Sequence, residues 1–422
     1  MTTPKTILFV TYGGGHIRMV IPVVRELQKD ANIHCEILAL TTAYSVCQSE
    51  GLPCKGYHDF LTENDAQALA WGRKLAANQH TPGSGISEEE SIAYLGLNYH
   101  DLILQYGEEK AAEKWRREGR QGFLPLSFMR RIIDRVKPDM VVTTNSPRSE
   151  RAATQIANER NIPTLAMIDL FGILNLFKLE SKYITVLSQR VIDNMISDTG
   201  AYPNQQFLIT GNPAFDRAFD YRGPINHNWR RTHFPTIERG AKALLWLDEG
   251  SYTDRKTGLA RQFTDEETTA NLDQLAHAAK ANNSTLLIRP HPSQTRALFD
   301  AWIQKKADPR ILFAGDVPLY PLLNAVDAVV IYTSTVGCEA LLMQRPVIQL
   351  NYYPGTFNMH LGEWGLARTA ATPADLPKVI CETFDHNQSS DVEMRVAKEF
   401  PQERAAPKVA DAIRKILSEG RT

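Results

Sequence analysis

The sequence has no long apolar run, and no stretch reaches the roughly 18 to 20 residues that a membrane-spanning helix needs. The first residues, Met-Thr-Thr-Pro-Lys, lead straight into a predicted strand without an apolar signal-peptide segment. We therefore expect a cytoplasmic protein, with membrane contact limited to peripheral association at the inner face.

Cysteine is sparse, and its spacing does not suit a metal site. The five cysteines (Cys35, Cys47, Cys54, Cys338 and Cys381) are scattered along 422 residues. An odd number of isolated cysteines is typical of reduced thiols in the cytosol. The cysteines therefore do not indicate a metal site. We expect no bound metal and no cofactor.

Net charge is also nearly absent, at −1 at pH 7, which argues against a dominant nucleic-acid-binding surface. The chain contains 43% hydrophobic and 23% charged residues, as is ordinary for a globular protein. Its length exceeds that of most single domains, so we expect two.

Short apolar runs alternate with segments of helical periodicity in the first half of the chain. We predict strands at residues 6–11, 34–40, 138–144, 162–169, 182–187 and 206–211, and helices at 17–29, 42–50 and 149–160. Residues 61–130 interrupt this alternation with charged, helical sequence, which we interpret as an insertion carrying a mobile loop at 82–85.

The alternation stops at residues 216–240, which are rich in turn formers, and then restarts. We predict strands at 242–247, 285–289, 310–313, 327–332 and 346–350, and helices at 265–281, 294–305, 318–325 and 335–343. The pattern predicts an α/β protein with a doubly wound parallel sheet in each half. The predicted boundaries are an N-terminal domain at 1–215, a linker at 216–240, a C-terminal domain at 241–400 and a closing helix within 401–422.

In the second half, two predicted strands each end in a polar loop. One continues into Arg-Pro-His-Pro at residues 289–292, and the other into Thr-Ser-Thr at 333–335, where a helix begins. Ligands of open α/β sheets bind at the carboxyl ends of the strands, and the N–H groups at a helix start suit phosphate. These loops therefore predict a nucleotide-donor site.

Each side chain of this donor site has a chemical reason to be there. Two prolines fix the backbone around His291, whose imidazole could stabilise a departing phosphate. Glu339 lies one helical turn after Thr335, so its carboxylate could bind ribose hydroxyls; the alternatives are a core histidine and a helix cap. The predicted donor-binding residues are Arg289, His291, Ser334, Thr335, Gly337 and Glu339.

In the first half, Tyr-Gly-Gly-Gly-His at residues 12–16 lies at the first strand-to-helix turn. It lacks the third glycine of a dinucleotide fingerprint and is not a Walker A loop. His16 could act as a general base towards an acceptor hydroxyl, and Asp169, at the end of a later strand, is the other candidate. A tight turn and helix caps are the structural alternatives. The predicted acceptor-binding residues are Gly14, Gly15, Thr144, Asn145 and Ser146.

Asp248 and Glu249 follow the first strand of the second half. Paired carboxylates there could bind a metal or act as acid and base, although a simple turn explains them equally well.

Three segments give the chain a resemblance to the GT-B glycosyltransferase superfamily: Ile-Thr-Gly-Asn-Pro-Ala-Phe-Asp at 209–216, Arg-Pro-His-Pro at 289–292, and residues 334–347. Within it, the chain is similar to bacterial capsule and surface-polysaccharide transferases and to non-hydrolysing UDP-GlcNAc 2-epimerases. The resemblance implies two Rossmann-like domains facing a central cleft, with the donor on the second and the acceptor on the first. His291 would match a His-Pro motif, Ser334 and Thr335 a phosphate-contacting Ser/Thr motif, and Glu339 a ribose-binding Glu.

Two departures bear on the reaction. The epimerases begin with a Gly-Thr-Arg-Pro-Glu type loop, whereas this chain has the loop at 12–16, closer to MurG-like transferases, which favours transfer. Asp248-Glu249-Gly250 resembles in letters the acidic motif of bacterial sialyltransferases, but it lies past the predicted linker.

We therefore expect a metal-independent glycosyltransferase that moves a sugar from a nucleotide-sugar donor to a glycan or lipid-linked acceptor in bacterial surface-polysaccharide biosynthesis. UDP- and CMP-linked donors rank ahead of GDP- and dTDP-linked ones. The alternatives are a nucleotide-sugar 2-epimerase or hydrolase, and a non-catalytic nucleotide-sugar binder.

Overall fold

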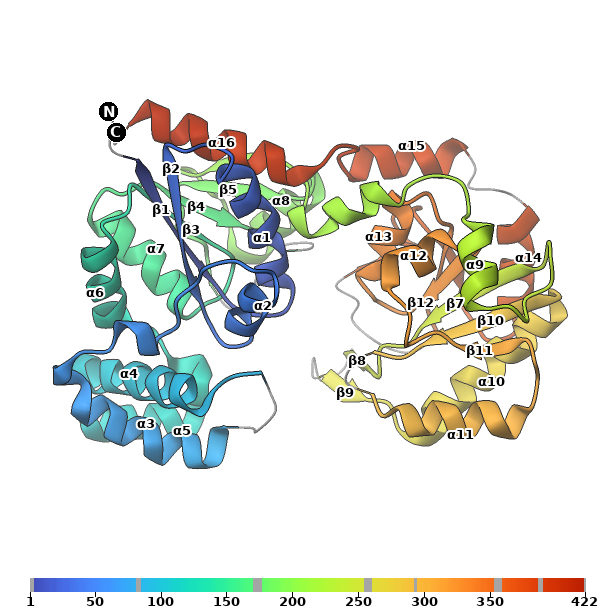
Figure 1. Cartoon of the computed structure of the whole chain (residues 1–422), viewed down its shortest axis with the longest axis horizontal. Helices are drawn as coiled ribbons and strands as arrows, with labels where there is room; N and C mark the ends of the chain where they lie inside the picture. Colours follow the sequence, from blue (N-terminus) through green and yellow to red (C-terminus); the bar gives the residue numbers. More distant parts are fainter. Residues whose placement is uncertain are drawn as a thin grey trace. The chain divides into compact units, whose positions relative to one another are not determined.

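The computed structural model describes residues 4–80, 85–169, 177–253, 260–291, 294–352, 359–385 and 390–420 (Figure 1). The chain divides into two compact units, one of Met1–Asp216 with Glu403–Thr422 and one of Arg217–Gln402. Each unit is built on a parallel six-stranded sheet flanked by helices, which confirms the predicted doubly wound fold class. No helix of the described residues is long and apolar enough to cross a membrane.

The sheet of the first unit has the strand order β2-β1-β3-β4-β5-β6. Its strands are β1 (Lys5–Thr11), β2 (Ile33–Ala39), β3 (Met140–Thr143), β4 (Thr164–Met167), β5 (Tyr183–Val186) and β6 (Gln206–Ile209). The helices between them are α1 (Gly15–Leu27), α2 (Ala43–Ser49), α7 (Ser149–Glu159) and α8 (Gln189–Thr199). In β1, Ile7 and Phe9 belong to one apolar core and Leu8 and Val10 to another, because side chains alternate between the two faces of a strand.

The insertion between β2 and β3 folds as four helices that pack on one face of this sheet. They are α3 (Ala66–Gln79), α4 (Glu88–Tyr106), α5 (Glu108–Glu118) and α6 (Leu126–Val136). Helices α3 and α4 approach closely at two glycines: a Cβ atom at Gly72 would lie 2.1 Å from the Ile92 carbonyl oxygen, and one at Gly96 would lie 2.2 Å from that of Ala68. Most of the loop predicted at 82–85 lies outside the described residues.

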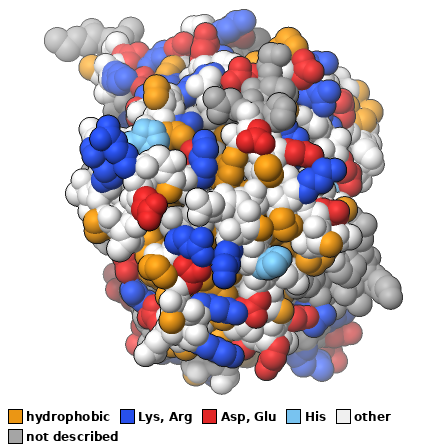
Figure 2. All heavy atoms as spheres, turned by 90° about the vertical axis from the view of Figure 1, so that its right-hand side faces the viewer, with side chains coloured by type: hydrophobic (Ala, Val, Ile, Leu, Met, Phe, Trp, Pro, Cys, Tyr) orange, Lys and Arg blue, Asp and Glu red, His pale blue; other side chains and the backbone are white. Residues whose placement is uncertain are grey.

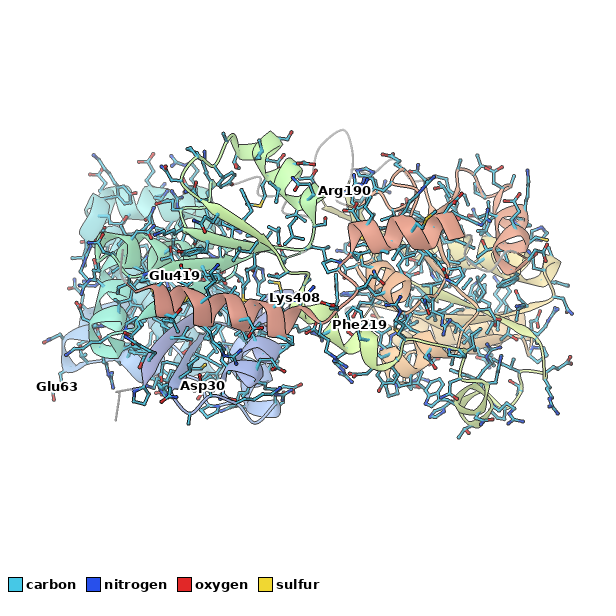
Figure 3. All side chains as sticks on the ribbon, turned by 90° about the horizontal axis from the view of Figure 1, so that it is seen from above. Asp30, Glu63, Arg190, Phe219, Lys408 and Glu419 are labelled. Atoms are coloured by element: carbon cyan, nitrogen blue, oxygen red, sulfur yellow. The ribbon has the colours of Figure 1, made fainter. Side chains whose placement is uncertain are left out.

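The last helix, α16 (Ala405–Glu419), returns to the first unit, and Figure 3 shows it running from near Lys408 to Glu419. Its apolar face joins the core that contains α1. The buried carboxylate of Asp216 accepts hydrogen bonds from the backbone N–H groups of Ala405 (2.6 Å) and Ala406 (2.8 Å) and so caps the helix. Burial raises the pKa of Asp216.

The second unit has the strand order β11-β10-β7-β12-β13-β14 and a separate antiparallel pair, β8-β9. The strands are β7 (Lys242–Leu247), β8 (Ser251–Thr253), β9 (Ala260–Gln262), β10 (Ser284–Arg289), β11 (Ile311–Phe313), β12 (Ala328–Ile331), β13 (Val347–Leu350) and β14 (Arg368–Ala370). The helices are α10 (Asp265–Ala281), α11 (Arg296–Lys306), α12 (Leu319–Asn324), α13 (Val336–Leu342), α14 (Leu376–Asp385) and α15 (Ser390–Glu399). On the face of this unit seen in Figure 2, basic and acidic side chains are interspersed.

The segment predicted as a linker contains the helix α9 (His227–His233), which lies in the second unit. The Arg230 guanidinium is buried, pairs with Asp327 at 2.8 Å and donates to the carbonyl oxygens of Ala241 and Ala325. These bonds join α9 to the residues just before strands β7 and β12. The turn-rich segment therefore contains a helix that is anchored to the second unit.

Candidate functional site

The candidate residues of the first unit gather where the strand order reverses. Strand β1 pairs with β2 on one side and β3 on the other, so the loops after β1 and β3 flank a topological switch point. Ligands of doubly wound sheets bind at such points. The structure places His16 in the first turn of α1, directly after the first loop, and Thr144 on the second loop.

Two glycines of the first loop are required for different reasons, one for its backbone conformation and one for close packing. Gly14 has φ 68°, which favours glycine. A Cβ atom at Gly13 would lie 1.7 Å from Thr42 Oγ1, so this glycine permits close packing on the β2–α2 turn. Gly15 begins α1, and a Cβ atom there or at Gly14 would meet none of the described atoms within 4 Å.

His16, Thr144 and Glu150 form a continuous hydrogen-bonded chain. His16 Nδ1 lies 2.6 Å from Thr144 Oγ1, and Thr144 Oγ1 donates to Glu150 Oε1 at 2.6 Å. The Glu150 carboxylate is buried and also accepts the N–H groups of Ser146 (2.6 Å) and Tyr12 (3.2 Å). Burial raises the pKa of Glu150.

The hydrogen bonds from His16 through Thr144 to Glu150 select one tautomer of His16. A threonine hydroxyl carries one proton, and here it is donated to Glu150. Thr144 Oγ1 therefore accepts from His16 Nδ1–H, which leaves Nε2 of the neutral ring with its lone pair. That is the form of histidine that can remove a proton.

The other predicted residues of this unit form a second pair. Asn145 Nδ2 donates to Asp169 Oδ1 at 2.8 Å. Ser146 is buried, its N–H bonds Glu150, and its Oγ has no hydrogen-bond partner in the described part of the chain.

Sequence reasoning missed Glu150. The residue stands in the first turn of α7, where an acidic side chain is ordinary because it complements the helix dipole. A signal was nevertheless present, since Glu150 follows the same strand end as Thr144 and precedes the buried stripe of Ala152, Ala153 and Ile156.

In the second unit the loops after β7 and β12 also flank a reversal of strand order. Glu249, after β7, turns its carboxylate to the loop after β12. Its Oε1 accepts the N–H groups of Tyr332 (3.0 Å), Thr333 (2.6 Å) and Ser334 (2.7 Å), and Oε2 accepts the Thr333 hydroxyl. Burial raises the pKa of Glu249 to about 7. Backbone N–H groups that the sequence suggested for phosphate therefore bind an internal carboxylate.

Asp248 holds the loop that carries His291. The buried Asp248 carboxylate accepts Gln294 Nε2 at 2.7 Å, and Gln294 Oε1 accepts the His291 N–H at 2.8 Å. Trp246 Nε1 and the Gly250 N–H also donate to Asp248. Burial raises the pKa of Asp248. The exposed His291 is thus fixed through its backbone by a strand-end carboxylate.

Two predicted donor-site residues, Arg289 and Gly337, make contacts that shape the protein itself. The Arg289 guanidinium donates to the carbonyl oxygens of Ala314 (3.0 Å) and Val317 (2.6 Å), and burial lowers its pKa. It therefore shapes the loop after β11. A Cβ atom at Gly337 would lie 2.6 Å from Ile331 Cδ1, so this glycine lets α13 pack on β12.

The remaining donor-site residues lie at or near the start of α13. Ser334 Oγ accepts the Val336 N–H at 3.4 Å, and Thr335 precedes the helix as its N-cap. The Glu339 carboxylate is buried and accepts the Tyr320 hydroxyl of α12. Tyr320 stacks on Tyr221, with ring centroids 5.8 Å apart. No group of three or more His, Cys, Asp or Glu in the described ranges is arranged to hold a metal ion.

Comparison with known protein families gives a match in the second unit. Residues 240–360 match the family described as capsule polysaccharide biosynthesis protein. This segment includes Asp248, Glu249, His291 and Glu339. No curated protein matches the chain.

Solved structures match over nearly the whole chain. A UDP-GlcNAc 2-epimerase from Methanocaldococcus jannaschii has a TM-score of 0.60 at 14% identity, covering 98% of this chain and 100% of its own. The enzyme from Neisseria meningitidis bound to UDP-GlcNAc gives 0.59 at 13% identity, with coverages of 97% and 100%. A putative epimerase from Listeria monocytogenes gives 0.63 at 13% identity, with coverages of 99% and 98%.

The chain has the GT-B type of fold. At these identities the likeness establishes the two Rossmann-like units and their topology. It confirms the fold predicted from the sequence, and the roles of individual residues stay predictions.

Proposed function

We propose that this GT-B protein is a glycosyltransferase of surface-polysaccharide biosynthesis, which moves a sugar from a nucleotide-sugar donor to a glycan or lipid-linked acceptor. The match of residues 240–360 to the capsule polysaccharide biosynthesis family is the observation that carries it. The match falls on the unit whose loops the sequence predicts to bind the donor. UDP- or CMP-linked sugars are the proposed donors, and neither a metal nor a cofactor takes part.

On the acceptor side, the tautomer of His16 supports its role as the base. Its Nε2 would take the proton of the acceptor hydroxyl while that oxygen attacks the anomeric carbon of the donor. The bond from that carbon to the phosphate oxygen breaks, and the nucleotide leaves with the bonding electrons. Glu150, through Thr144, would stabilise the imidazolium that forms. Asp169 is the alternative base, and it has an amide partner in Asn145 instead of a relay.

On the donor side, His291 and the hydroxyls of Ser334 and Thr335 would stabilise the departing phosphate. Glu339 would bind the ribose. Asp248 supports this assignment because its bond to Gln294 fixes the backbone at His291. Glu249 would orient the loop that carries Ser334.

The test is a transfer assay with UDP-, CMP-, GDP- and dTDP-linked sugars and polysaccharide fragments as acceptors, with products identified by mass spectrometry. His291→Ala and Glu339→Ala should each reduce transfer at least about 100-fold, the range for loss of a group that stabilises developing charge. The matched controls are the exposed residues His233→Ala and Glu363→Ala, which should keep full activity. Unchanged transfer in the first two variants would contradict the donor assignment.

A second candidate, nucleotide-sugar 2-epimerase, is favoured by the fold likeness to UDP-GlcNAc 2-epimerases. Incubation with UDP-GlcNAc alone distinguishes the two, because an epimerase gives a new sugar isomer in the proton NMR spectrum without any acceptor. A transferase gives either no reaction or slow hydrolysis.

A further inference from the structure

The helical insertion of the first unit contains a pocket that the proposed reaction does not use. The hollow measures about 500 Å3 including its open mouth. It lies between the ends of α3 and α5, the first two turns of α4, and the turn after β2. The side chains that matter are Thr41, His80, Glu90, Ser91, Tyr94 and Arg120.

This pocket adjoins the glycine loop that precedes His16. Thr41 follows β2, and the next residue, Thr42, packs on Gly13. The Tyr94 hydroxyl lies 3.0 Å from that of Tyr12, which immediately precedes the glycines. A molecule in the pocket would therefore lie along the same sheet edge as the candidate base.

The walls have the mixed character that suits a sugar. Tyr94 and Leu95 offer apolar surface for C–H groups, while the Ser91 hydroxyl and the His80 imidazole, 2.9 Å apart, offer hydrogen-bonding groups. Thr41 has φ 55°, a left-handed conformation that is costly for a β-branched residue. Such strain is concentrated at ligand sites.

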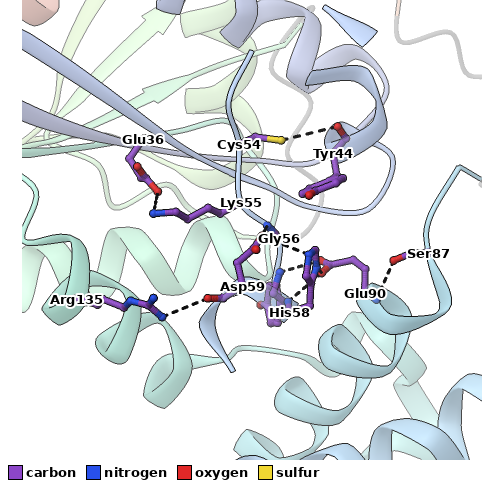
Figure 4. Close-up of polar contacts among 11 residues, drawn as sticks. Glu36, Tyr44, Cys54, Lys55, Gly56, His58, Asp59, Ser87, Glu90 and Arg135 are labelled. Carbon is purple, nitrogen blue, oxygen red and sulfur yellow. Dashed lines mark hydrogen bonds and ion pairs between the residues drawn. The ribbon is translucent and has the colours of Figure 1, made fainter. Parts of the chain in front are cut away.

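Among the described residues that line the pocket, Glu90 is the acidic one, and its carboxylate already pairs with His58. Figure 4 shows Glu90 against His58, whose Nδ1 lies 2.6 Å from Glu90 Oε2. The backbone N–H groups of Tyr57 (3.0 Å) and His58 (3.1 Å) also donate to this carboxylate. The hydrogen bond to Glu90 raises the pKa of His58, which favours the imidazolium opposite this carboxylate.

Arg120 has no such counter-charge. One of its terminal nitrogens donates to the Gln79 carbonyl oxygen at 2.8 Å, and its buried Nε has no hydrogen-bond partner in the ranges that the structure describes. Within those ranges no carboxylate pairs with Arg120. The residue as a whole is partly exposed, but buried N–H groups such as its Nε are normally paired, and the fork of a guanidinium matches a carboxylate.

We propose that this pocket is an acceptor subsite that binds an acidic sugar, with the sugar carboxylate paired to Arg120 and the ring lying against Tyr94. The inference rests on the proposed function, because it assigns the acceptor of that reaction to the class of carboxylated glycans. The helical insertion is then the element that selects the acceptor.

The test measures binding without any nucleotide sugar, by isothermal titration calorimetry. The probes are an unsulfated chondroitin tetrasaccharide and a sialic acid tetramer, each compared with its carboxyl-reduced, neutral form. At least one acidic probe should bind wild type on the order of 10-fold or more tighter than its neutral form, as expected for a charged hydrogen bond. Arg120→Gln should remove this difference.

Arg116→Gln is the matched control, since it removes the same charge from an exposed position four residues away. Ser91→Leu, which fills the pocket and leaves Arg120 in place, should weaken acidic and neutral probes alike. It keeps the test valid should Arg120→Gln fail to fold.

The subsite proposal is wrong if wild type binds the acidic probes and their neutral forms equally well. It is also wrong if Arg120→Gln still binds the acidic probes more tightly than the neutral ones. Competition by free UDP in this assay also overturns it, because the anion site would then take phosphate. If the protein prefers acidic probes through Arg120 but transfers no sugar, only the proposed function is contradicted. Transfer without acid preference would contradict only the subsite.

Discussion

Glu150 and Glu249 are both buried carboxylates at strand-end loops, yet their hydrogen bonds differ in one respect. Each oxygen of Glu150 accepts at least one backbone N–H, which cannot accept a proton in return. Among the described residues, the backbone N–H groups that donate to Glu249 all bond Oε1, and Oε2 accepts only the Thr333 hydroxyl. A hydroxyl can reverse its bond, so Oε2 can carry a proton and donate it to Thr333.

This geometry gives a prediction for Glu249→Gln. The amide oxygen would keep the three N–H bonds, and the amide nitrogen would donate to Thr333. The folded pKa of Glu249, about 7, lies above the ordinary value of 4.5, so wild type gains stability from the protonated form below pH 4.5 and loses it as pH rises to 7. We expect Glu249→Gln to match wild type at pH 4.5 and to be more stable at pH 8, by up to about 3 kcal/mol.

Urea denaturation of wild type and Glu249→Gln across pH 4.5 to 8 measures this difference. Glu150→Gln is the contrasting variant, because either amide orientation sets an NH2 group against a backbone N–H. It should destabilise by about 1–3 kcal/mol at pH 4.5, where Glu249→Gln matches wild type. Parallel pH curves for wild type and Glu249→Gln would rule out the titration of Glu249.

Thr144 gives the second prediction at this scale. Thr144→Val removes the hydroxyl between His16 and Glu150 with little change in volume. If His16 is the base, kcat should fall about 10-fold to 100-fold with KM little changed, because the ring loses the partner that selects its tautomer. Thr144→Ser restores the hydroxyl and should restore most of the rate.

The pH profile of kcat separates this role from a structural one. Thr144→Val should move the acid limb of the profile, whereas Asp169→Asn should not. An unmoved limb in Thr144→Val, with the loss confined to KM, would instead support the earlier assignment of Thr144 to acceptor binding.

At the scale of elements, α3 and α4 depend on glycines that helix propensity disfavours. Gly72→Ala would normally stabilise a helix by about 1 kcal/mol. Here the new Cβ atom would meet the Ile92 carbonyl oxygen at 2.1 Å, backbone that cannot move aside without separating the helices. We expect a net loss of about 1–3 kcal/mol, as for overpacking at a close contact.

Thermal unfolding followed by circular dichroism checks this prediction. Asn78→Ala, at an exposed position of the same helix, is the control and should be neutral or slightly stabilising. Because α4 lines the pocket with Arg120, Gly72→Ala should also weaken acidic-glycan binding. A Gly72→Ala protein as stable as wild type would show that the helices can separate without cost.

Sequence patterns predicted the strands of both sheets except β14, because parallel strands buried on both faces have apolar centres, as β1, β7 and β12 do. They did not predict α9, whose stability comes from the Arg230–Asp327 pair across 97 residues. The residues of the candidate site likewise fall into those that the sequence predicted and those that it did not. His16 and Glu339 follow local motifs, whereas Glu150 and the Glu249 contacts depend on loops that meet only in the folded sheet.

At the scale of the whole molecule, the division into two compact units lets ligand binding be assigned to one of them. The proposed donor residues Glu339 and His291 lie in the second unit, and the proposed acceptor residues in the first. A ligand stabilises the unit it binds by mass action, by about 2.7 kcal/mol at a concentration 100-fold above Kd. For a unit of this size, that corresponds to a rise in Tm of roughly 5–10 °C.

We therefore expect UDP or CMP to raise the Tm of the second unit selectively in differential scanning calorimetry. Glu339→Ala should lower the ligand-free transition of the second unit, because the Tyr320 hydroxyl loses its acceptor. Measured from that baseline, the nucleotide shift should be lost in the variant. His16→Ala should keep the full shift, because its residue lies in the first unit. An equal shift of both transitions, or a shift that survives in Glu339→Ala, would place the nucleotide elsewhere and remove the donor assignment on which the transfer proposal depends.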